Sequence, residues 1–301
     1  MNRKKNLLPQ GFRDILANEA NTQFEYGKKL IKNFNSWGYL FIEPPLIEYQ
    51  KNLINDKKYE KLNKKTLTFS DPLTKEKISL RPDITSQLAR VAEDRLFGLP
   101  RPLRLCYFGD VFRADKPKLS SERQFKQAGI EIIDSKSLFA DIEIINISLD
   151  TLKKINFKNI VLDLNAPIIL EKILDDFNVS PAQRIKIKNS VAKKNINEIK
   201  TYNSKLFSTL NKIIDSSGPL KKNLSNLKKI KLGKNAKKIM DNFIELCNFY
   251  EKNNYKDYKI SVDVLDHRGF EYYTGITFSI FCLNSKKEIC RGGRYLTSKK
   301  K

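Results

Sequence analysis

The chain has 301 residues, of which 40% are hydrophobic, and its 57 Lys and Arg against 34 Asp and Glu give a formal net charge of +23. This length fits one large domain or one domain plus a smaller one, and the apolar content is sufficient for a core, which excludes a disordered chain. No apolar run approaches the ~18 residues of a membrane span, and the basic N-terminus has no apolar stretch behind it, which excludes a signal peptide.

Cysteine and histidine usage narrows the chemistry further. The sequence has a single histidine, His267, and four scattered cysteines without a C-x-x-C pair: Cys106, Cys247, Cys282 and Cys290. This spacing argues against a disulfide framework and a zinc knuckle, and one histidine excludes a two-histidine metal site. We therefore expect no metal, no cofactor and a cytoplasmic location.

The two basic residue types are distributed differently. The 44 Lys are spread along the whole chain, whereas seven of the 13 Arg lie between Arg81 and Arg123 and three lie between Arg268 and Arg294. Arginine makes fixed bidentate contacts with carboxylate and phosphate, while lysine is a strongly solvated cation. We interpret the lysine excess mainly as solvated surface, with nucleic-acid binding the less favoured alternative, and expect a site at the arginine clusters.

The first half of the chain alternates between helical and strand patterns. Residues 17–37 have apolar positions at helical spacing, and 39–42 is typical of a strand closed by prolines. Residues 66–80 predict a β-hairpin with a turn at Asp71-Pro72. A helix over 84–96 follows, with Asp83 as its N-cap.

The rest of the chain continues with strands around a long helical segment. We expect strands over 104–114 and 123–133, a helix over 138–154, helices throughout 168–255, a strand over 259–265 and a hairpin of 275–283 with 287–291. Hairpins dominate the strand-rich parts, which favours an α+β fold, an antiparallel sheet flanked by helices and carrying a helical insertion. A Walker A loop and a G-x-G-x-x-G turn are both absent from the sequence.

One strand face carries polar groups suited to a small ligand. Phe125, Gln127, Gly129 and Glu131 alternate and therefore share a face, and the glycine predicts open space between the amide and the carboxylate. The opposite face, beginning at Ala128 and including Ile130 and Ile132, looks like core. A solvated outer face is the alternative, and it is somewhat favoured when this strand is considered alone.

Three further groups complete a possible amino-acid site. Arg268 or Arg113 would hold a carboxylate, Asp83, Thr85 and Gln127 would accept or orient an ammonium, and Glu131 with Tyr273 would meet a polar side chain. The alternatives are a simple cap for Asp83, a surface ion pair for Arg113, and an ordinary turn with core aromatics for 267–275.

The motifs resemble the catalytic core of class II histidyl-tRNA synthetases. They are Leu80-Arg-Pro-Asp-Ile-Thr85, Val111-Phe-Arg-Ala-Asp115, Arg123-Gln-Phe-Lys-Gln127-Ala-Gly-Ile-Glu131 and Arg268-Gly-Phe-Glu-Tyr-Tyr-Thr-Gly275, with Pro9-Gln-Gly-Phe-Arg-Asp14 and Trp37-Gly-Tyr near the start. The resemblance covers about residues 9–150 and 259–295. It implies a synthetase-like core over 1–165 and 258–301, with the helical insertion at 166–257.

Two kinds of relative share this core: the synthetase, and the histidyl-tRNA-synthetase-like regulatory subunit of ATP phosphoribosyltransferase. Asp83 stands where synthetases carry Glu, the 115–121 loop is poor in Arg, and past Gly292-Gly-Arg-Tyr295 we expect the third class II motif and the anticodon-binding domain to be absent. These departures favour the non-catalytic regulatory subunit. Regulatory subunits also continue beyond that stretch, so we expect a chain truncated before its last sheet strand.

The resemblance implies specific partners and site residues. It implies a complex with a short-form catalytic phosphoribosyltransferase subunit in the first step of histidine biosynthesis, feedback by L-histidine as effector, and a homodimer formed through the 17–50 region. The residues at the family's histidine-binding positions are Asp83, Thr85, Arg113, Gln127, Glu131, Arg268, Tyr272 and Tyr273. The alternatives are a catalytic core that adenylates histidine and a basic RNA-binding module.

Overall fold

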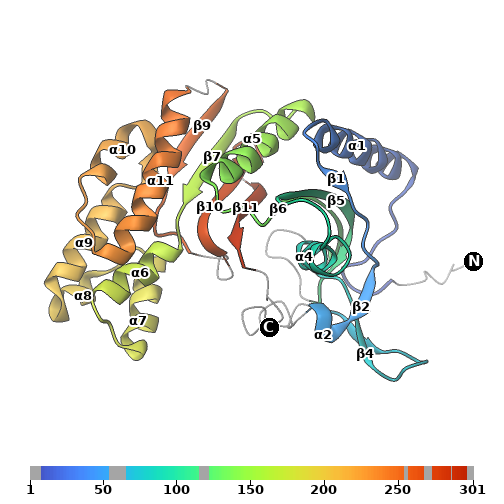
Figure 1. Cartoon of the computed structure of the whole chain (residues 1–301), viewed down its shortest axis with the longest axis horizontal. Helices are drawn as coiled ribbons and strands as arrows, with labels where there is room; N and C mark the ends of the chain where they lie inside the picture. Colours follow the sequence, from blue (N-terminus) through green and yellow to red (C-terminus); the bar gives the residue numbers. More distant parts are fainter. Residues whose placement is uncertain are drawn as a thin grey trace, which may run out of the picture. The chain divides into compact units, whose positions relative to one another are not determined.

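The computed structural model describes residues 8–53, 66–114, 122–253, 257–267, 273–285 and 287–296 (Figure 1). Its contacts divide the chain into two compact units, residues 1–136 with 297–301, and residues 137–296. The two units therefore divide between residues 136 and 137, whereas the sequence analysis expected the boundary between core and insertion between residues 165 and 166.

The first unit is built on a three-stranded sheet in the order β1-β5-β6, in which β6 spans Gln124–Ile133. Helix α1 (Ala17–Ser36) precedes β1 (Leu40–Phe41), which pairs in parallel with β5 (Leu103–Phe112). The sequence therefore predicts α1 and both long strands correctly. Gly27 lets α1 lie close to this sheet, because a Cβ there would come 2.4 Å from the Phe108 ring.

A second sheet in the first unit has the order β2-β4-β3 and is antiparallel throughout. Its strands are β2 (Ile47–Tyr49), β3 (Thr68–Ser70) and β4 (Lys77–Leu80), and the short helix α2 (Gln50–Leu53) follows β2. The predicted 66–80 hairpin is confirmed. Arg90 ties α4 (Thr85–Asp94) to this sheet, since its Nε donates to Glu48 Oε2 over 3.2 Å.

The core of the first unit lies between α4 and one face of β5 and β6 (Gln124–Ile133). Its buried side chains come from α4 and from alternate positions of the two strands: Ile84, Leu88, Ala92, Leu103, Leu105, Tyr107, Val111 and Ile133. The opposite β6 face differs from the expected core, because Ala128 is exposed and Ile130 and Ile132 are only half-buried. The side chains of this face are apolar, as predicted, but the other described residues bury them only in part.

The second unit has a five-stranded mixed sheet in the order β11-β10-β7-β9-β8. Helix α5 (Leu138–Lys154) has the predicted bounds and leads to β7 (Ile160–Asn165), a strand that the sequence pattern did not predict. β7 pairs in parallel with β9 (Tyr258–Val262) and antiparallel with β10 (Tyr273–Cys282). β10 and β11 (Lys287–Tyr295) form the predicted final hairpin, and β8 (Gly218–Pro219) ends the sheet.

Helices fill most of the predicted helical segment, and Figure 1 shows α10 and α11 beside β9. They are α6 (Ile168–Asp176), α7 (Pro181–Ala192), α8 (Asn197–Tyr202), α9 (Ser204–Asp215), α10 (Leu220–Lys228) and α11 (Lys234–Lys252). Their apolar faces share one core with α5, β7, β9 and β10. In the described part of the chain, no helix has both the length and the apolar character needed to span a membrane.

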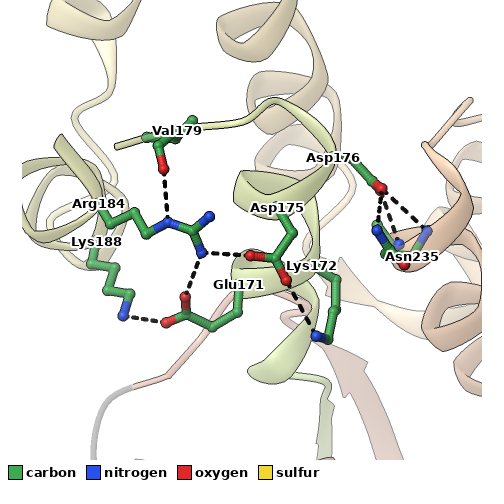
Figure 2. Close-up of polar contacts among 9 residues, drawn as sticks. Glu171, Lys172, Asp175, Asp176, Val179, Arg184, Lys188 and Asn235 are labelled. Atoms are coloured by element: carbon green, nitrogen blue, oxygen red, sulfur yellow. Dashed lines mark hydrogen bonds and ion pairs between the residues drawn. The ribbon is translucent and has the colours of Figure 1, made fainter. Parts of the chain in front are cut away.

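Polar contacts join α6 to α7 and to α11 (Figure 2). Arg184 on α7 donates to Asp175 Oδ1 over 2.7 Å, and this guanidinium is the main cause of the lowered Asp175 pKa. On the other side, Asp176 accepts from the backbone N–H groups of Asn235 (3.2 Å) and Ala236 (3.0 Å). Asp176 thereby supplies the cap that α11 lacks, because Gly233 at the N-cap has no side chain to bond.

We expect Asp176→Ala to lower the free energy of unfolding by about 1–2 kcal/mol, because it leaves helical N–H groups without their acceptor. Urea unfolding measures this change. The matched control is Asp241→Ala at an exposed position within α11, the helix that Asp176 caps, and it should change stability by less than about 0.5 kcal/mol. Equal effects of the two substitutions would contradict the capping role.

Asp163 on β7 gives the second unit a pH-dependent stability. Burial raises the pKa of its carboxyl above the ordinary value, against the lowering effect of hydrogen bonds from Ser261 and Asn165, while the Asp263 charge raises it further. A group whose pKa is higher in the folded than in the unfolded protein stabilises the fold when it is protonated. This contribution is complete at pH values below the unfolded-state pKa, and it is lost as pH rises through the folded-state pKa.

The Asn side chain of the Asp163→Asn variant cannot ionise, so the variant lacks the loss of stability that the wild type undergoes at this position as pH rises. The variant should therefore gain stability relative to the wild type between about pH 4 and about pH 7. Urea titrations of both proteins at several pH values measure the difference. Asp241→Asn serves as the exposed control. A difference between Asp163→Asn and wild type that stays constant with pH would refute the assignment.

Candidate functional site

The structure describes six of the eight predicted site residues. Asp83, Thr85, Arg113, Gln127 and Glu131 belong to the first unit, and Tyr273 belongs to the second. Arg268 and Tyr272 lie outside the described residues. The first-unit residues come from the start of α4, the end of β5 and one face of β6, so a single unit positions most of the candidate site.

Asp83, Thr85 and Gln127 form a connected polar group where α4 begins. Asp83 Oδ1 accepts from the Thr85 backbone N–H over 2.8 Å and from Gln127 Nε2 over 3.4 Å. Gln127 Oε1 accepts from the Ile84 backbone N–H over 3.1 Å. The N-cap position is Ile84 rather than the predicted Asp83, although the Asp83 carboxylate still bonds the first N–H of the helix.

Tyr107 is a site residue that the sequence pattern did not reveal. Its hydroxyl lies 3.2 Å from Thr85 Oγ1, and a Cβ at Gly129 would come within 2.3 Å of that hydroxyl oxygen. The space above Gly129 is therefore filled by Tyr107, which corrects the expectation of an open hollow. Its position on β5, on the same face as Leu105 and two residues before a glycine, was the available signal.

The Arg113 guanidinium is held by an aromatic ring and has an N–H group that lacks an acceptor among the described residues. Its guanidinium stacks over the Phe125 ring at 4.9 Å, and its Nε is buried without a hydrogen-bond partner among the described residues. A buried unpaired donor costs about 1–3 kcal/mol, and more when it is charged. An arriving carboxylate or phosphate oxygen would remove that cost.

The base of the β5–β6 hairpin is held by the N-terminal segment. Arg113 N donates to Arg123 O over 2.8 Å, and Arg123 N donates to Gly11 O over 2.7 Å. Arg123 also stacks over Phe12 at 5.2 Å, and Phe12 stacks on Phe112 at 6.5 Å between ring centroids. The Pro9–Asp14 motif thus contacts the strand ends next to Arg113 and Arg123 through one backbone hydrogen bond and the Phe12 ring.

Arg81, from the same motif as Asp83, has a structural position. It is buried and donates from Nε to Asp110 O and from Nη1 to Pro44 O, each over 2.7 Å. Gly109 makes room for it, since a Cβ there would come 2.4 Å from Nη2. Burial lowers the Arg81 pKa, against the raising effect of Asp110 and of more distant carboxylates.

The remaining predicted residues lie on long strands. Glu131 is half-buried on β6 and pairs with Leu105 in the sheet register. Tyr273 is buried at the start of β10 and pairs with Tyr295 on β11. Arg294, in the Gly-Gly-Arg-Tyr stretch, donates to Asp141 Oδ2 over 2.7 Å and so ties β11 to α5.

The first-unit groups suit recognition of a small polar molecule. They offer a carboxylate at Asp83, hydroxyls at Thr85 and Tyr107, and a cation at Arg113, which together match an ammonium and a carboxylate. Among the described residues, no group of three or more His, Cys, Asp or Glu side chains could hold a metal ion.

Comparison with known proteins gives relatives that match most of the chain. The histidyl-tRNA synthetase family model matches residues 11–300. The ATP phosphoribosyltransferase regulatory subunit of Paramagnetospirillum magneticum is 31% identical, over 96% of this chain and 76% of that protein. The histidine–tRNA ligase of Methanocaldococcus jannaschii is 33% identical, over 95% of this chain and 68% of that protein.

Solved structures agree on the fold. An ATP phosphoribosyltransferase regulatory subunit/histidyl-tRNA synthetase from Bacillus halodurans has a TM-score of 0.84 at 23% identity, covering 98% of this chain and 77% of that one. The ATP phosphoribosyl transferase (HisG:HisZ) complex from Thermotoga maritima contains a chain with a TM-score of 0.71 at 18% identity, covering 92% and 93%. The predicted class II synthetase-like α+β fold is confirmed. The chain belongs to the histidyl-tRNA synthetase family, which includes the ATP phosphoribosyltransferase regulatory subunits that it resembles.

Proposed function

We propose that this chain is a non-catalytic regulatory subunit of ATP phosphoribosyltransferase, acting in the first step of L-histidine biosynthesis. The observation that carries the proposal is the similarity to proteins of that name over 96% of the chain. The sequence supports it as well, because Asp83 stands where synthetases carry Glu.

The alternative is a synthetase-type core that adenylates histidine. It is favoured by the 33% identity to a histidine–tRNA ligase and by the retained Arg113 and Gln127. The two functions differ in chemistry, since adenylation releases pyrophosphate from ATP and a regulatory subunit does not.

The two functions are separated by reconstitution. We expect the purified chain to show no histidine-dependent ATP–pyrophosphate exchange, and to raise the activity of a short-form catalytic subunit from the same source at least about tenfold.

We also propose a homodimer. In sedimentation without the catalytic subunit, the purified chain should have a mass of about twice the 35.0 kDa of one chain. The support for the homodimer is the exposed apolar surface of the 17–50 region, where Phe24 is 62% and Leu40 is 52% exposed.

A clear exchange signal would overturn the regulatory function in favour of the synthetase. A complete histidyl-tRNA synthetase assayed in parallel controls the exchange reaction. A monomer in sedimentation would contradict the proposed homodimer and would leave the proposed regulatory function unaffected.

The proposal includes L-histidine as effector, bound by Asp83, Thr85, Arg113, Gln127 and Glu131 together with Arg268, Tyr272 and Tyr273. Feedback of this kind needs a coupling free energy of about 1–3 kcal/mol between the effector and the catalytic subunit. The unpartnered Nε of Arg113 supports a carboxylate-bearing ligand.

We expect Arg113→Met to weaken L-histidine binding about 10- to 100-fold, because it removes a charged hydrogen-bond donor from the ligand carboxylate. Calorimetry with histamine, which lacks that carboxylate, is the matched ligand control. Wild type should prefer histidine over histamine, and the variant should bind both about equally. An unchanged preference in the variant would show that Arg113 does not hold the carboxylate.

A further inference from the structure

An ion pair joins the helices of the second unit to the turn that follows β9. Lys194, which lies just after α7, donates from Nζ to Asp263 Oδ2 over 2.7 Å. Ser217, which lies just after α9, donates from Oγ to Asp263 Oδ1 over 3.3 Å. These two residues precede Asp263 by 69 and 46 positions in the chain, so distant parts of the helical segment hold both oxygens of the carboxylate.

Lys194 occupies a backbone position at which lysine is unfavourable. It follows the C-cap of α7, its N–H donates to Val191 O over 2.9 Å, and its backbone is left-handed, with φ at 53°. This conformation favours glycine, and asparagine tolerates it better than most residues do. Among the described helices, three others end in the same way and have such a residue at this position: Gly38 after α1, Asn156 after α5 and Asn178 after α6.

The exception at α7 indicates a role for the lysine side chain. A residue held in a sparsely populated backbone conformation is most informative where the side chain has a specific contact. The Lys194 side chain has such a contact in its pair with Asp263. Glycine at this position would suit the backbone but would leave the Asp263 carboxylate without its cation.

The 263–267 turn leads to residues that the sequence predicts to bind histidine. Asp263 O accepts from the backbone N–H of Asp266 over 3.0 Å, and the two residues between them are buried in the core of the unit. The turn ends directly before Arg268, which lies outside the described residues, and Tyr273 begins β10. Any movement of the turn therefore shifts the point from which the chain continues to Arg268.

The Lys194–Asp263 pair contributes little to the stability of the fold. The Lys194 side chain is 51% exposed, and exposed ion pairs add little to the free energy of unfolding. The turn is also anchored without this pair, because Asp263 N donates to Leu164 O over 3.1 Å and Ala166 N donates to Val264 O over 3.2 Å. What the pair adds is a fixed position of the turn relative to the end of α7.

We propose that Lys194 is a positioning residue for the histidine effector. Its pair with Asp263, supported by Ser217, holds the 263–267 turn in place before the ligand arrives, which lowers the entropy cost of binding. The inference rests on the proposed function, because it takes L-histidine as the ligand of the residues that follow the turn. It makes effector binding depend on the helical segment, and by linkage a bound effector stabilises this contact.

The test compares three substitutions of Lys194. Lys194→Met removes the charge and keeps most of the side-chain length, Lys194→Gly also relieves the left-handed backbone, and Lys194→Arg keeps a cation. Lys153→Met is the matched control, because Lys153 forms an ion pair of the same length, 2.7 Å, with Asp257 in the same unit. Calorimetry with the full chain measures L-histidine binding, and thermal unfolding measures stability.

We expect Lys194→Met and Lys194→Gly to weaken L-histidine binding about 3- to 20-fold, and Lys194→Arg and Lys153→Met to bind like the wild type. Lys194→Gly should unfold at no lower temperature than Lys194→Met, because glycine adopts the left-handed conformation without strain. An equal loss of affinity in these two variants, whatever their difference in stability, is a result that a merely structural role would not produce.

Four results would overturn the inference. Unchanged histidine affinity in Lys194→Met and Lys194→Gly would show that the pair does not place the effector residues. Affinities that follow the unfolding temperatures would assign a structural role to the pair, and an equal loss in Lys153→Met would assign the effect to overall charge. Absence of histidine binding by the wild type would overturn the inference together with the proposed effector, whereas activation of the catalytic subunit by Lys194→Met reports the regulatory function separately.

Discussion

The antiparallel register between β5 and β6 is the constraint on which the first unit depends. It sets Gln127 opposite Gly109 and Gly129 opposite Tyr107, and both glycines make room for a neighbouring side chain. Because side chains alternate, a slip of one residue would move Gln127 and Glu131 to the other face of the sheet. The start of α4 would then lose its amide partner, so the fold and the candidate site are specified by one register.

Alternation allowed the sequence to predict the faces of β6, but it could not predict what fills them. Gln127 and Glu131 share one side of β6, as expected, but this side faces the α4 core, which the sequence analysis had assigned to the opposite side. The filling of the Gly129 space depends on Tyr107, which is 22 residues away in the chain and becomes a neighbour only through strand pairing. Similarly, β7 was missed because its short apolar run is buried and periodicity does not distinguish such a strand from a helix segment.

Composition and packing divide this chain at different places. The change to a Lys-, Asn- and Ile-rich sequence begins near residue 168, whereas the contact boundary lies between residues 136 and 137. The reason is visible in the core of the second unit, where Ile145 of α5 and Leu162 of β7 are buried in the same cluster as Phe243 of α11. Helices rich in lysine still need an apolar face, and α5 with the sheet provides the surface against which that face is buried.

Three of the candidate site residues also have a structural role, so their presence alone does not indicate that the site binds a ligand. Asp83, Gln127 and Thr85 hold the start of α4 on β6 and β5, so packing alone is sufficient reason to retain them. Arg113 differs, because its buried Nε has no partner among the described residues and an unpaired charged donor destabilises the fold. Stacking on Phe125 orients this guanidinium but does not satisfy its N–H group. A ligand oxygen would satisfy it, and for that reason the proposal that the site binds an anion rests on Arg113 rather than on the better-bonded residues around it.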